Sequence, residues 1–199
     1  MSSPELVARS IELPSGELRL LQPREAAELP DDGPVEWAPV APYWAVLWRS
    51  GVALARELDG LSPAGLLVVE LGCGLGAPSI AAARAGASVL ATDASGEALE
   101  LLTRNAAANA VSIETAVVDW ADPVAVLERG PFDLVLAADV LYERTAAAQL
   151  LALLPRLASE AWIADPGRPA AEAFVEQASR RWDVETRERG LVSLHRLRC

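Results

Sequence analysis

The sequence predicts an α/β protein with a Rossmann-like, doubly wound sheet of seven strands. Three observations support this prediction. Short apolar runs alternate with helical patterns from residue 66 onward, the first run leads into a glycine-rich turn, and the last two runs share a turn too short to hold a helix. Alternating strands and helices form a parallel sheet covered by helices on both faces. The short final turn requires an antiparallel pair, so the predicted sheet is mostly parallel with an antiparallel C-terminal hairpin.

The first 42 residues are predicted to be a short hairpin and helix extension, followed by the main domain over residues 43–199. Strand-like runs at Ile11–Leu13 and Glu17–Leu21 flank a Pro-Ser-Gly turn, which is typical of a hairpin. We interpret the proline-rich stretch from Pro23 to Pro42 as a loop. Apolar residues at helical spacing then predict a helix over Tyr43–Leu58.

The main domain continues with five short apolar runs, which we predict to be parallel strands. They lie at Leu66–Leu71, Ser88–Thr92, Glu114–Val118, Phe132–Ala137 and Ala161–Ala164. The first run is uninterrupted, as expected of a central strand that is buried on both faces. The helical patterns after these strands lie at Ala77–Ala85, Glu97–Asn109, Val124–Glu128, Arg144–Leu157 and Ala170–Trp182. The terminal hairpin is predicted to pair Val184–Glu188 with Leu191–Arg196, which makes six of the seven strands parallel or nearly so.

A glycine-rich loop lies between the first parallel strand and its helix. It contains Gly72, Cys73, Gly74 and Gly76. Glycines allow a tight turn and let a ligand approach the backbone closely. The adjoining helix N-terminus presents unpaired N–H groups. A tight turn that binds nothing is the structural alternative.

Acidic residues lie at the ends of three consecutive predicted strands. Glu70 precedes the first glycine, where it could meet the ammonium group of an amino acid. Asp93 could accept both hydroxyls of a ribose. Asp119 could bind an adenine amino group while Trp120 covers the base. The structural alternatives are that Asp93 or Ser95 caps the next helix and that Trp120 belongs to the core.

S-adenosylmethionine fits these residues better than a nicotinamide dinucleotide, the close competitor. The dinucleotide fingerprint is G-x-G-x-x-G, whereas Gly72, Gly74 and Gly76 alternate with single residues. A pyrophosphate also has no need of an acid at position 70. The remaining length leaves no room for a second catalytic domain. The sequence therefore favours S-adenosylmethionine as the cofactor.

Composition narrows the expected partners. The net charge of −11, without a basic stripe, argues against nucleic acid and against an anionic membrane surface. All 17 basic residues are arginine, which excludes Schiff-base and P-loop lysines. Cys73 and Cys199 form neither a metal spacing nor a disulfide framework, so we expect no metal and a cytoplasmic location. No signal pattern or membrane-length apolar run occurs, and we expect a monomer.

At these residues the chain resembles the class I, seven-β-strand S-adenosylmethionine-dependent methyltransferases. A narrower resemblance is to the methyltransferase-like protein lysine methyltransferases. It rests on the aromatic segment Tyr43–Gly51 and on Asp139–Tyr142, which matches their Asp/Glu-x-x-Tyr/Phe motif. The stretch Asp165–Pro169 is similar to one in the branch that modifies the β subunit of electron transfer flavoprotein. At position 49 the chain has arginine, whereas the methyltransferase-like protein lysine methyltransferases often have proline there.

The resemblance implies methyl transfer to the lysine amine of a protein substrate. Asp139 would orient the amine or hold it as it loses its proton, and Tyr142 would form a wall of the acceptor channel. Trp48 would lie over the cofactor or line the entrance, and Ala138 would contact the cofactor. Arg168 is a candidate for the rim of the pocket. The sequence leaves open that Asp139 only ties down a loop.

Two other functions remain open from the sequence. One is a small-molecule N- or O-methyltransferase, in which Pro23–Pro42 would close over the pocket as a lid. The other is a cofactor-binding module without catalysis, because a fold does not guarantee its chemistry. His195, the only histidine, and the tryptophans Trp162 and Trp182 are interpreted as packing residues rather than as parts of the site.

Overall fold

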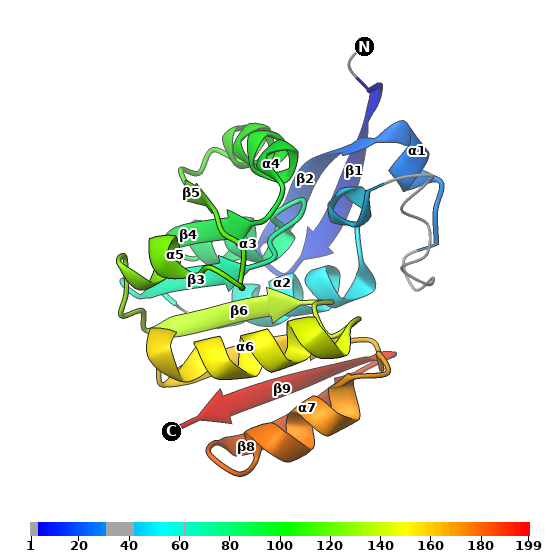
Figure 1. Cartoon of the computed structure of the whole chain (residues 1–199). Helices are drawn as coiled ribbons and strands as arrows, with labels where there is room; N and C mark the ends of the chain where they lie inside the picture. The colour runs from blue at the N-terminus through cyan, green and yellow to red at the C-terminus, as the bar shows by residue number, and fades with distance from the viewer. Residues whose placement is uncertain (1–3, 31–41, 62) are drawn as a thin grey trace.

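A seven-stranded sheet forms the centre of the computed structural model, which describes residues 4–30, 42–61 and 63–199 (Figure 1). Its strands are β3 (Leu67–Leu71), β4 (Ser88–Asp93), β5 (Glu114–Val117), β6 (Leu134–Ala138), β7 (Glu160–Asp165), β8 (Asp183–Arg189) and β9 (Val192–Arg198). Their order across the sheet is β5-β4-β3-β6-β7-β9-β8. Only β9 among them runs against its neighbours, so the predicted mostly parallel sheet with an antiparallel terminal hairpin is confirmed.

Helices cover both faces of this sheet. They are α2 (Arg49–Asp59), α3 (Ala77–Arg84), α4 (Gly96–Ala108), α5 (Val124–Leu127), α6 (Arg144–Leu157) and α7 (Ala171–Ala178). One hydrophobic cluster packs α2, α3 and α4 on the sheet, and another packs α5, α6 and α7 on it. The chain builds the sheet outward from β3 to β5 and then returns to β6 beside β3. The carboxyl ends of β3 and β6 therefore form a switch point, where ligands of open α/β sheets bind.

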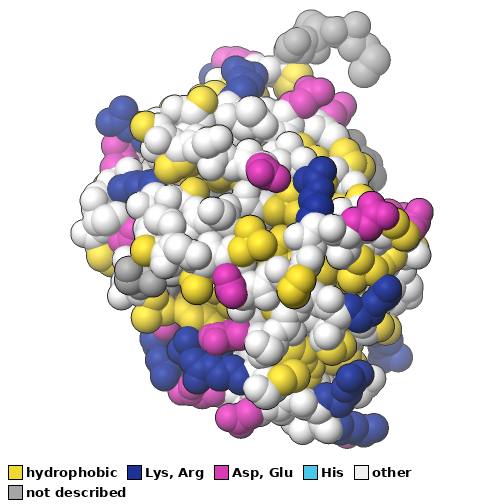
Figure 2. Space-filling view, turned by 90° about the vertical axis from the view of Figure 1, so that its left-hand side faces the viewer, with side chains coloured by type: hydrophobic (Ala, Val, Ile, Leu, Met, Phe, Trp, Pro, Cys, Tyr) yellow, Lys and Arg dark blue, Asp and Glu magenta, His cyan; other side chains and the backbone are white. Residues whose placement is uncertain are grey.

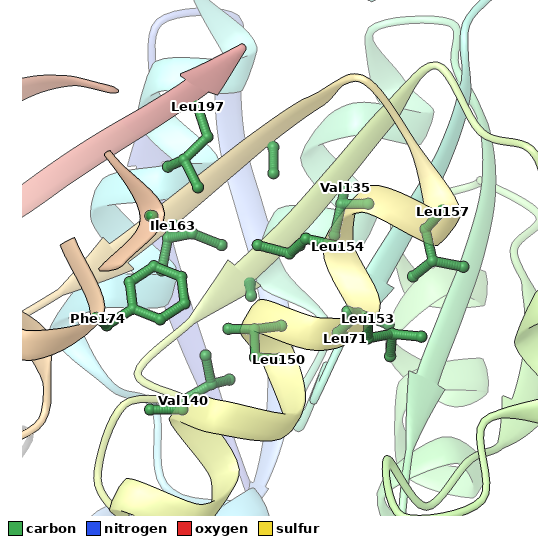
Figure 3. Close-up of a cluster of buried hydrophobic side chains, with 14 of the residues drawn as sticks. Leu71, Val135, Val140, Leu150, Leu153, Leu154, Leu157, Ile163, Phe174 and Leu197 are labelled. Carbon is green, nitrogen blue, oxygen red and sulfur yellow. The ribbon is translucent and has the colours of Figure 1, made fainter. Parts of the chain in front are cut away.

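The central strand contributes to both hydrophobic clusters because successive strand residues point to opposite faces. Val68 lies in the cluster beneath α2 and α3, whereas Val69 and Leu71 lie in the cluster beneath α6. Figure 3 shows Leu71 close to Leu150 and Leu153 of α6, with the other labelled side chains of this cluster around them. This two-sided burial explains the uninterrupted apolar run in the sequence.

The N-terminal hairpin is longer than the sequence predicted. It consists of β1 (Leu6–Leu13) and β2 (Gly16–Pro23), which pair over their whole lengths as a separate two-stranded sheet. Its apolar side chains join the cluster beneath α2, α3 and α4. Asn105 of α4 accepts a hydrogen bond from the Leu21 amide at 2.7 Å and so attaches β2 to the main domain.

Two predictions for the segment before α2 were wrong. The stretch interpreted as a loop begins with a one-turn helix, α1 (Arg24–Ala27); residues 31–41 of that stretch lie outside the described residues. The helix predicted over Tyr43–Leu58 starts only at Arg49. Before it lie a 3₁₀ turn, η2 (Tyr43–Ala45), and an extended backbone at Val46 and Trp48.

Tertiary contacts explain this break in the helical pattern. The Trp48 indole N–H donates to the Tyr43 carbonyl at 3.0 Å, and Ala45 and Val46 are buried against Ala26 of α1. The apolar residues at helical spacing therefore pack as an irregular segment, and the other elements differ from their predicted bounds only by a few residues at their ends.

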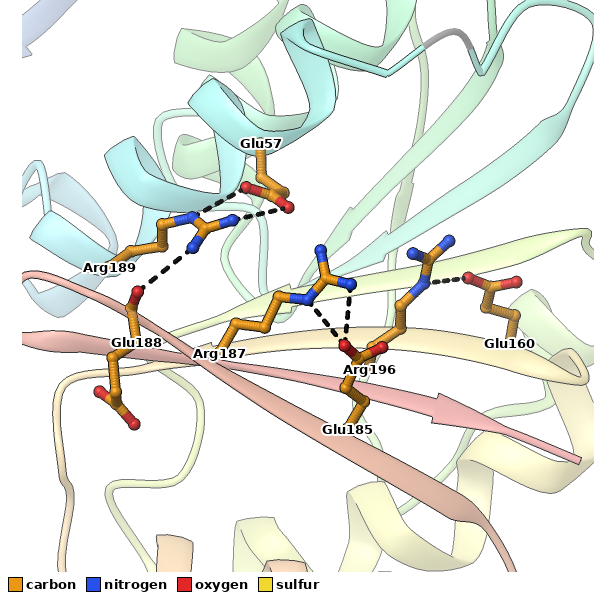
Figure 4. A network of polar contacts seen from close by, with 7 residues as sticks. All are labelled: Glu57, Glu160, Glu185, Arg187, Glu188, Arg189 and Arg196. Atoms are coloured by element: carbon orange, nitrogen blue, oxygen red, sulfur yellow. Dashed lines mark hydrogen bonds and ion pairs between the residues drawn. The ribbon is translucent and has the colours of Figure 1, made fainter.

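Acidic and basic side chains are interspersed on the face at the amino ends of the parallel strands (Figure 2). The terminal hairpin carries several ion pairs, including Arg189 with Glu57 at 3.1 Å and Arg196 with Glu160 at 2.8 Å (Figure 4). Exposed pairs of this kind add little to stability. Among the described residues, no helix combines the length and the apolar character needed to cross a membrane.

Candidate active site

A cavity of about 690 Å³ opens at the carboxyl ends of the central strands, beside the switch point between β3 and β6. Its size falls within the range of small-molecule sites. All the residues that the sequence singled out as catalytic or cofactor-binding line it: Trp48, Glu70, Gly72, Cys73, Gly74, Gly76, Asp93, Asp119, Trp120, Ala138, Asp139 and Tyr142. The fold thus brings five separate segments of the chain to one place.

Two groups of residues are among the lining residues that the sequence analysis missed. The first comprises Tyr43, Trp44, Val46 and Leu47, which were assigned to a helix. The second comprises Glu143, Thr145, Ala146 and Gln149, at the start of α6. The high density of aromatic residues before α2 could have identified the first group as part of the cavity lining. The second group follows directly after the Asp139–Tyr142 motif, whose turn brings the start of α6 to the cavity.

Packing within the protein requires glycine at two positions of the glycine-rich loop. Gly74 has φ +49°, and a Cβ atom there would lie 2.9 Å from the carbonyl oxygen of Trp44. Gly76 has φ +81°, and its Cβ would lie 2.5 Å from Cδ1 of Leu102. Both the backbone conformation and the space exclude a larger side chain. The loop therefore approaches the Tyr43–Trp48 segment closely enough for both to line the cavity.

Glu70 is a buried carboxyl at the end of β3, with 1% of its surface exposed. Its Oε2 atom accepts hydrogen bonds from the Ser79 amide at 2.9 Å and from the Ser79 hydroxyl. Burial raises the pKa of Glu70 to about 8, although the Ser79 bonds oppose this rise. A cation beside Glu70 would restore the charged form of this carboxyl.

Asp93 ties the glycine-rich loop to the end of β4. Its Oδ2 accepts from the Gly74 amide and its Oδ1 from the Ser95 amide, both at 2.9 Å. Burial raises the pKa of Asp93, and these backbone bonds oppose the shift. Ser95, not Asp93, caps α4, because its hydroxyl accepts from the Ala98 amide. Each Asp93 oxygen retains a lone pair for a ligand hydroxyl.

Asp119 and Trp120 follow the end of β5. Asp119 accepts a hydrogen bond from the Ala121 amide at 2.8 Å. Trp120 is partly buried against the core cluster that contains α6, and it also lines the cavity. Packing and ligand contact are therefore compatible for this ring.

Asp139 lies directly after β6 in the left-handed region, with φ +57°. Its amide donates to the Ala164 carbonyl at 2.9 Å. Its Oδ1 pairs with Nε of Arg168 at 2.6 Å, so the carboxylate does tie loops together and also lines the cavity. Burial raises the pKa of Asp139, and the Arg168 guanidinium opposes that rise. The half-buried Tyr142 ring lies 6.1 Å from the ring of Tyr43.

The cavity is acidic. Among the described residues its lining includes five carboxyl side chains, Glu70, Asp93, Asp119, Asp139 and Glu143, and no arginine or histidine. Such a lining disfavours a pyrophosphate and favours a ligand with cationic groups. These carboxyl groups thus fit the sulfonium and ammonium groups of S-adenosylmethionine and do not suit the pyrophosphate of a dinucleotide.

The three residues interpreted as packing lie outside the cavity lining, and that interpretation is confirmed. Trp162 on β7 and Trp182 after α7 are buried. His195 on β9 is also buried and contacts the Thr186 hydroxyl through Nδ1 at 2.9 Å. Burial lowers the pKa of His195.

Comparison with known sequences gives one family. The family model described as lysine methyltransferase matches residues 43–164. The electron transfer flavoprotein β-subunit lysine methyltransferase of Mus musculus is 34% identical over 169 residues, which cover 78% of this chain and 62% of that protein. Its Xenopus laevis counterpart is 36% identical over 163 residues, covering 78% and 64%. The chain thus spans a little over three fifths of the length of these relatives.

Two further similarities cover less of the chain or share less sequence identity. The protein N-lysine methyltransferase METTL21A of Danio rerio is 34% identical over 122 residues, covering 58% of this chain and 56% of that protein. Among solved structures, the 16S rRNA N2 G1207 methyltransferase of T. thermophilus, in complex with AdoMet and guanosine, superposes with a TM-score of 0.72. It is 18% identical and the match covers 100% of this chain and 52% of that chain, so it supports the fold alone.

Proposed function

The chain belongs to the lysine methyltransferase family, and we propose that it transfers a methyl group from S-adenosylmethionine to a lysine side chain of a protein substrate. One observation carries the proposal. The acids that end β3 and β4 or follow β5, together with Asp139 and Tyr142, line a single cavity that has no basic side chain among its described residues. The matched family region contains every one of these residues.

The residues of the cavity suit each part of the cofactor. Glu70 would interact with the ammonium group, and the carboxylate of Asp93 would accept the ribose hydroxyls. Asp119 would bind the adenine amino group beside the Trp120 ring. The backbone at Gly72, with no side chain, permits close approach. When bound, the cofactor supplies an already activated methyl group, so the protein's contribution is mainly to orient the reactants.

Asp139 and Tyr142 would handle the acceptor amine. A lysine amine has an ordinary pKa of about 10.4 and must be neutral to attack, so it has to lose a proton in the site. The Asp139 carboxylate can accept a hydrogen bond from the amine, orient it and receive that proton. The rings of Tyr142 and Tyr43 offer aromatic faces to the positive charge that develops on the nitrogen.

The substrate proposal follows the relatives with the largest matched length. The names of these relatives specify the β subunit of electron transfer flavoprotein, and each match covers 78% of this chain. We therefore propose that protein, or one with a similar exposed lysine segment, as the substrate. An acidic cavity mouth with aromatic walls suits an approaching lysine side chain.

A methyl-transfer assay with a matched variant tests the proposal. The purified chain is incubated with methyl-labelled S-adenosylmethionine and the electron transfer flavoprotein β subunit, and in parallel with cell lysate. We expect label on a discrete protein band with the wild type and at least a roughly 100-fold loss with Asp139→Asn, which keeps the shape but removes the charge. The affinity for S-adenosylhomocysteine should stay within about twofold, because no proposed cofactor contact is removed.

Two outcomes of this assay would contradict the proposal. Label confined to small molecules would indicate a small-molecule methyltransferase. Cofactor binding without transfer to any acceptor would indicate a binding module. The chain contains no lysine, so methylation of its own lysine side chains cannot be mistaken for substrate labelling.

A further inference from the structure

Arg168 lies just behind the cavity wall and contacts two residues of the site. We propose that Arg168 is a positioning residue for methyl transfer, which holds the Asp139 carboxylate and the Trp48 indole in one fixed arrangement. The effect of Arg168 on catalysis rests on the proposed function. The arrangement itself rests on contacts between three segments that are distant in the sequence.

The guanidinium group of Arg168 makes both contacts at once. Its Nε lies 2.6 Å from Oδ1 of Asp139, and its Cζ lies 5.2 Å from the centre of the Trp48 ring. The two charged side chains are 10% and 2% exposed, so solvent screens the pair weakly. A planar guanidinium can donate from its edge to a carboxylate while its face lies on an aromatic ring, which a lysine ammonium cannot do.

Backbone hydrogen bonds fix the positions of both Arg168 and Asp139. Asp165, fully buried at the end of β7, accepts hydrogen bonds from the Gly167 and Arg168 amides at 2.7 Å each. Gly167 has φ +87°, which favours glycine. On the neighbouring strand, the Asp139 amide donates to the Ala164 carbonyl. The ion pair therefore joins two adjacent strand ends that the sheet itself holds in register.

The contacts extend from the ion pair to the aromatic mouth of the cavity. The Trp48 indole N–H donates to the carbonyl of Tyr43, whose ring contacts that of Tyr142. The chain of contacts thus leads from Arg168 through Trp48 and Tyr43 to Tyr142, and directly to Asp139. Removing Arg168 would release both sides of the proposed acceptor site.

The surroundings of Asp139 make Arg168 electrostatically important. Within the described part of the chain, the groups that face this carboxyl are the Arg168 guanidinium, the Asp165 carboxyl, the Tyr142 hydroxyl and the Ser50 hydroxyl of α2. Burial raises the pKa of Asp139 and so does the charge of Asp165, whereas Arg168 lowers it. Without that guanidinium, Asp139 would bind a proton nearer neutral pH and could no longer accept one from an amine.

The first test measures the ionisation of Asp139 directly, without any methyl transfer. Carboxyl ¹³C chemical shifts of aspartate-labelled protein are followed by NMR against pH, and the Asp139 signal is identified by its loss in Asp139→Asn. In Arg168→Met we expect the titration midpoint of Asp139 to rise by at least about one pH unit, because a neighbouring opposite charge shifts a carboxyl by about 1–3 units. Arg168→Lys should raise it less.

Arg196→Met is the matched control. Arg196 also lies over a tryptophan, with its Cζ 4.5 Å from the centre of the Trp162 ring. It pairs with a carboxylate, Glu160, at 2.8 Å (Figure 4). Those residues lie outside the cavity lining. This variant should leave both the Asp139 titration and the methylation rate near wild type. It therefore measures separately the effect of losing an arginine that pairs with a carboxylate and lies over a tryptophan outside the cavity.

The second test follows the rate of protein methylation against pH. In Arg168→Met we expect kcat to fall roughly tenfold or more near pH 7 with KM little changed, and to recover partly at higher pH as Asp139 ionises. Arg168→Lys keeps the charge but not the flat face, so it should restore the pH profile and only part of the rate.

Two results would overturn the role given to Arg168. One is a titration midpoint of Asp139 in folded Arg168→Met that equals the wild-type value. The other is an Arg168→Lys variant whose kcat, KM and pH profile all equal those of the wild type. If Arg168→Met does not fold, the test uses Arg168→Lys alone, because that variant retains the positive charge. If the midpoint shifts as expected but the wild type methylates no protein, the ion pair stands and the proposed function is what fails.

Discussion

At the scale of single residues, burial determines how the strand-end carboxyls respond to pH, and Glu70 shows this most strongly. Its pKa of about 8 in the folded chain lies above its ordinary value of 4.5. Between those values the folded chain holds a proton that the unfolded chain releases. The free energy of unfolding should therefore fall as the pH rises through this window.

Glu70→Gln should remove this dependence, because the amide stays neutral and its oxygen can still accept from Ser79. Between pH 5 and pH 8 we expect the free energy of unfolding of the wild type to fall by roughly 2–4 kcal/mol more than that of the variant. Urea unfolding at several pH values measures both. Parallel curves for the two proteins would show that the Glu70 carboxyl does not titrate in this range.

Asp93→Asn tests the carboxylate assigned to the ribose. The asparagine oxygen can still accept one of the backbone hydrogen bonds, but the charge is lost. We expect the affinity for S-adenosylhomocysteine to weaken by roughly 1–3 kcal/mol, measured by calorimetry. Asp133→Asn is the control, because Asp133 also accepts a backbone amide, that of Leu67 at 2.7 Å, at the opposite end of β3. Equal affinities for Asp93→Asn and the wild type would remove Asp93 from the cofactor site.

At the scale of elements, periodicity predicted the helices and strands of the sheet but failed before α2. The apolar spacing over Tyr43–Leu58 is helical, yet the part before Arg49 follows contacts that no local pattern encodes. Gly74 approaches the Trp44 carbonyl, and Trp48 lies against Arg168. The sequence could identify these residues as candidates, but it could not indicate that they form an irregular wall of the cavity.

Gly74→Ala should disturb that wall. The variant places a Cβ atom 2.9 Å from the Trp44 carbonyl oxygen at a residue with φ +49°, so either the loop or the Tyr43–Trp48 segment has to move. We expect a loss of roughly 1–3 kcal/mol of stability in urea unfolding, together with weaker cofactor binding. Gly96→Ala, at the start of α4 with open space around it, should be neutral or slightly stabilising. A Gly74→Ala protein as stable as Gly96→Ala would contradict the close packing of this segment.

At the scale of the whole molecule, the sheet and its cavity follow from signals that repeat along the chain. Alternating strands and helices specified the parallel sheet, and a two-residue turn specified the antiparallel edge. The cavity residues were predictable because parallel strands end at the same edge, so acids that follow consecutive strands come together. The pairing of Arg168 with Asp139 was not predictable, since it depends on how the ends of β6 and β7 lie in three dimensions.

The most direct test of the central claim is a crystal structure of the chain with S-adenosylhomocysteine bound. We predict the ribose at Asp93, the adenine between Asp119 and Trp120, and the amino-acid ammonium near Glu70, with the sulfur facing Asp139 and Tyr142. A ligand bound elsewhere, or these side chains turned away from it, would contradict the account.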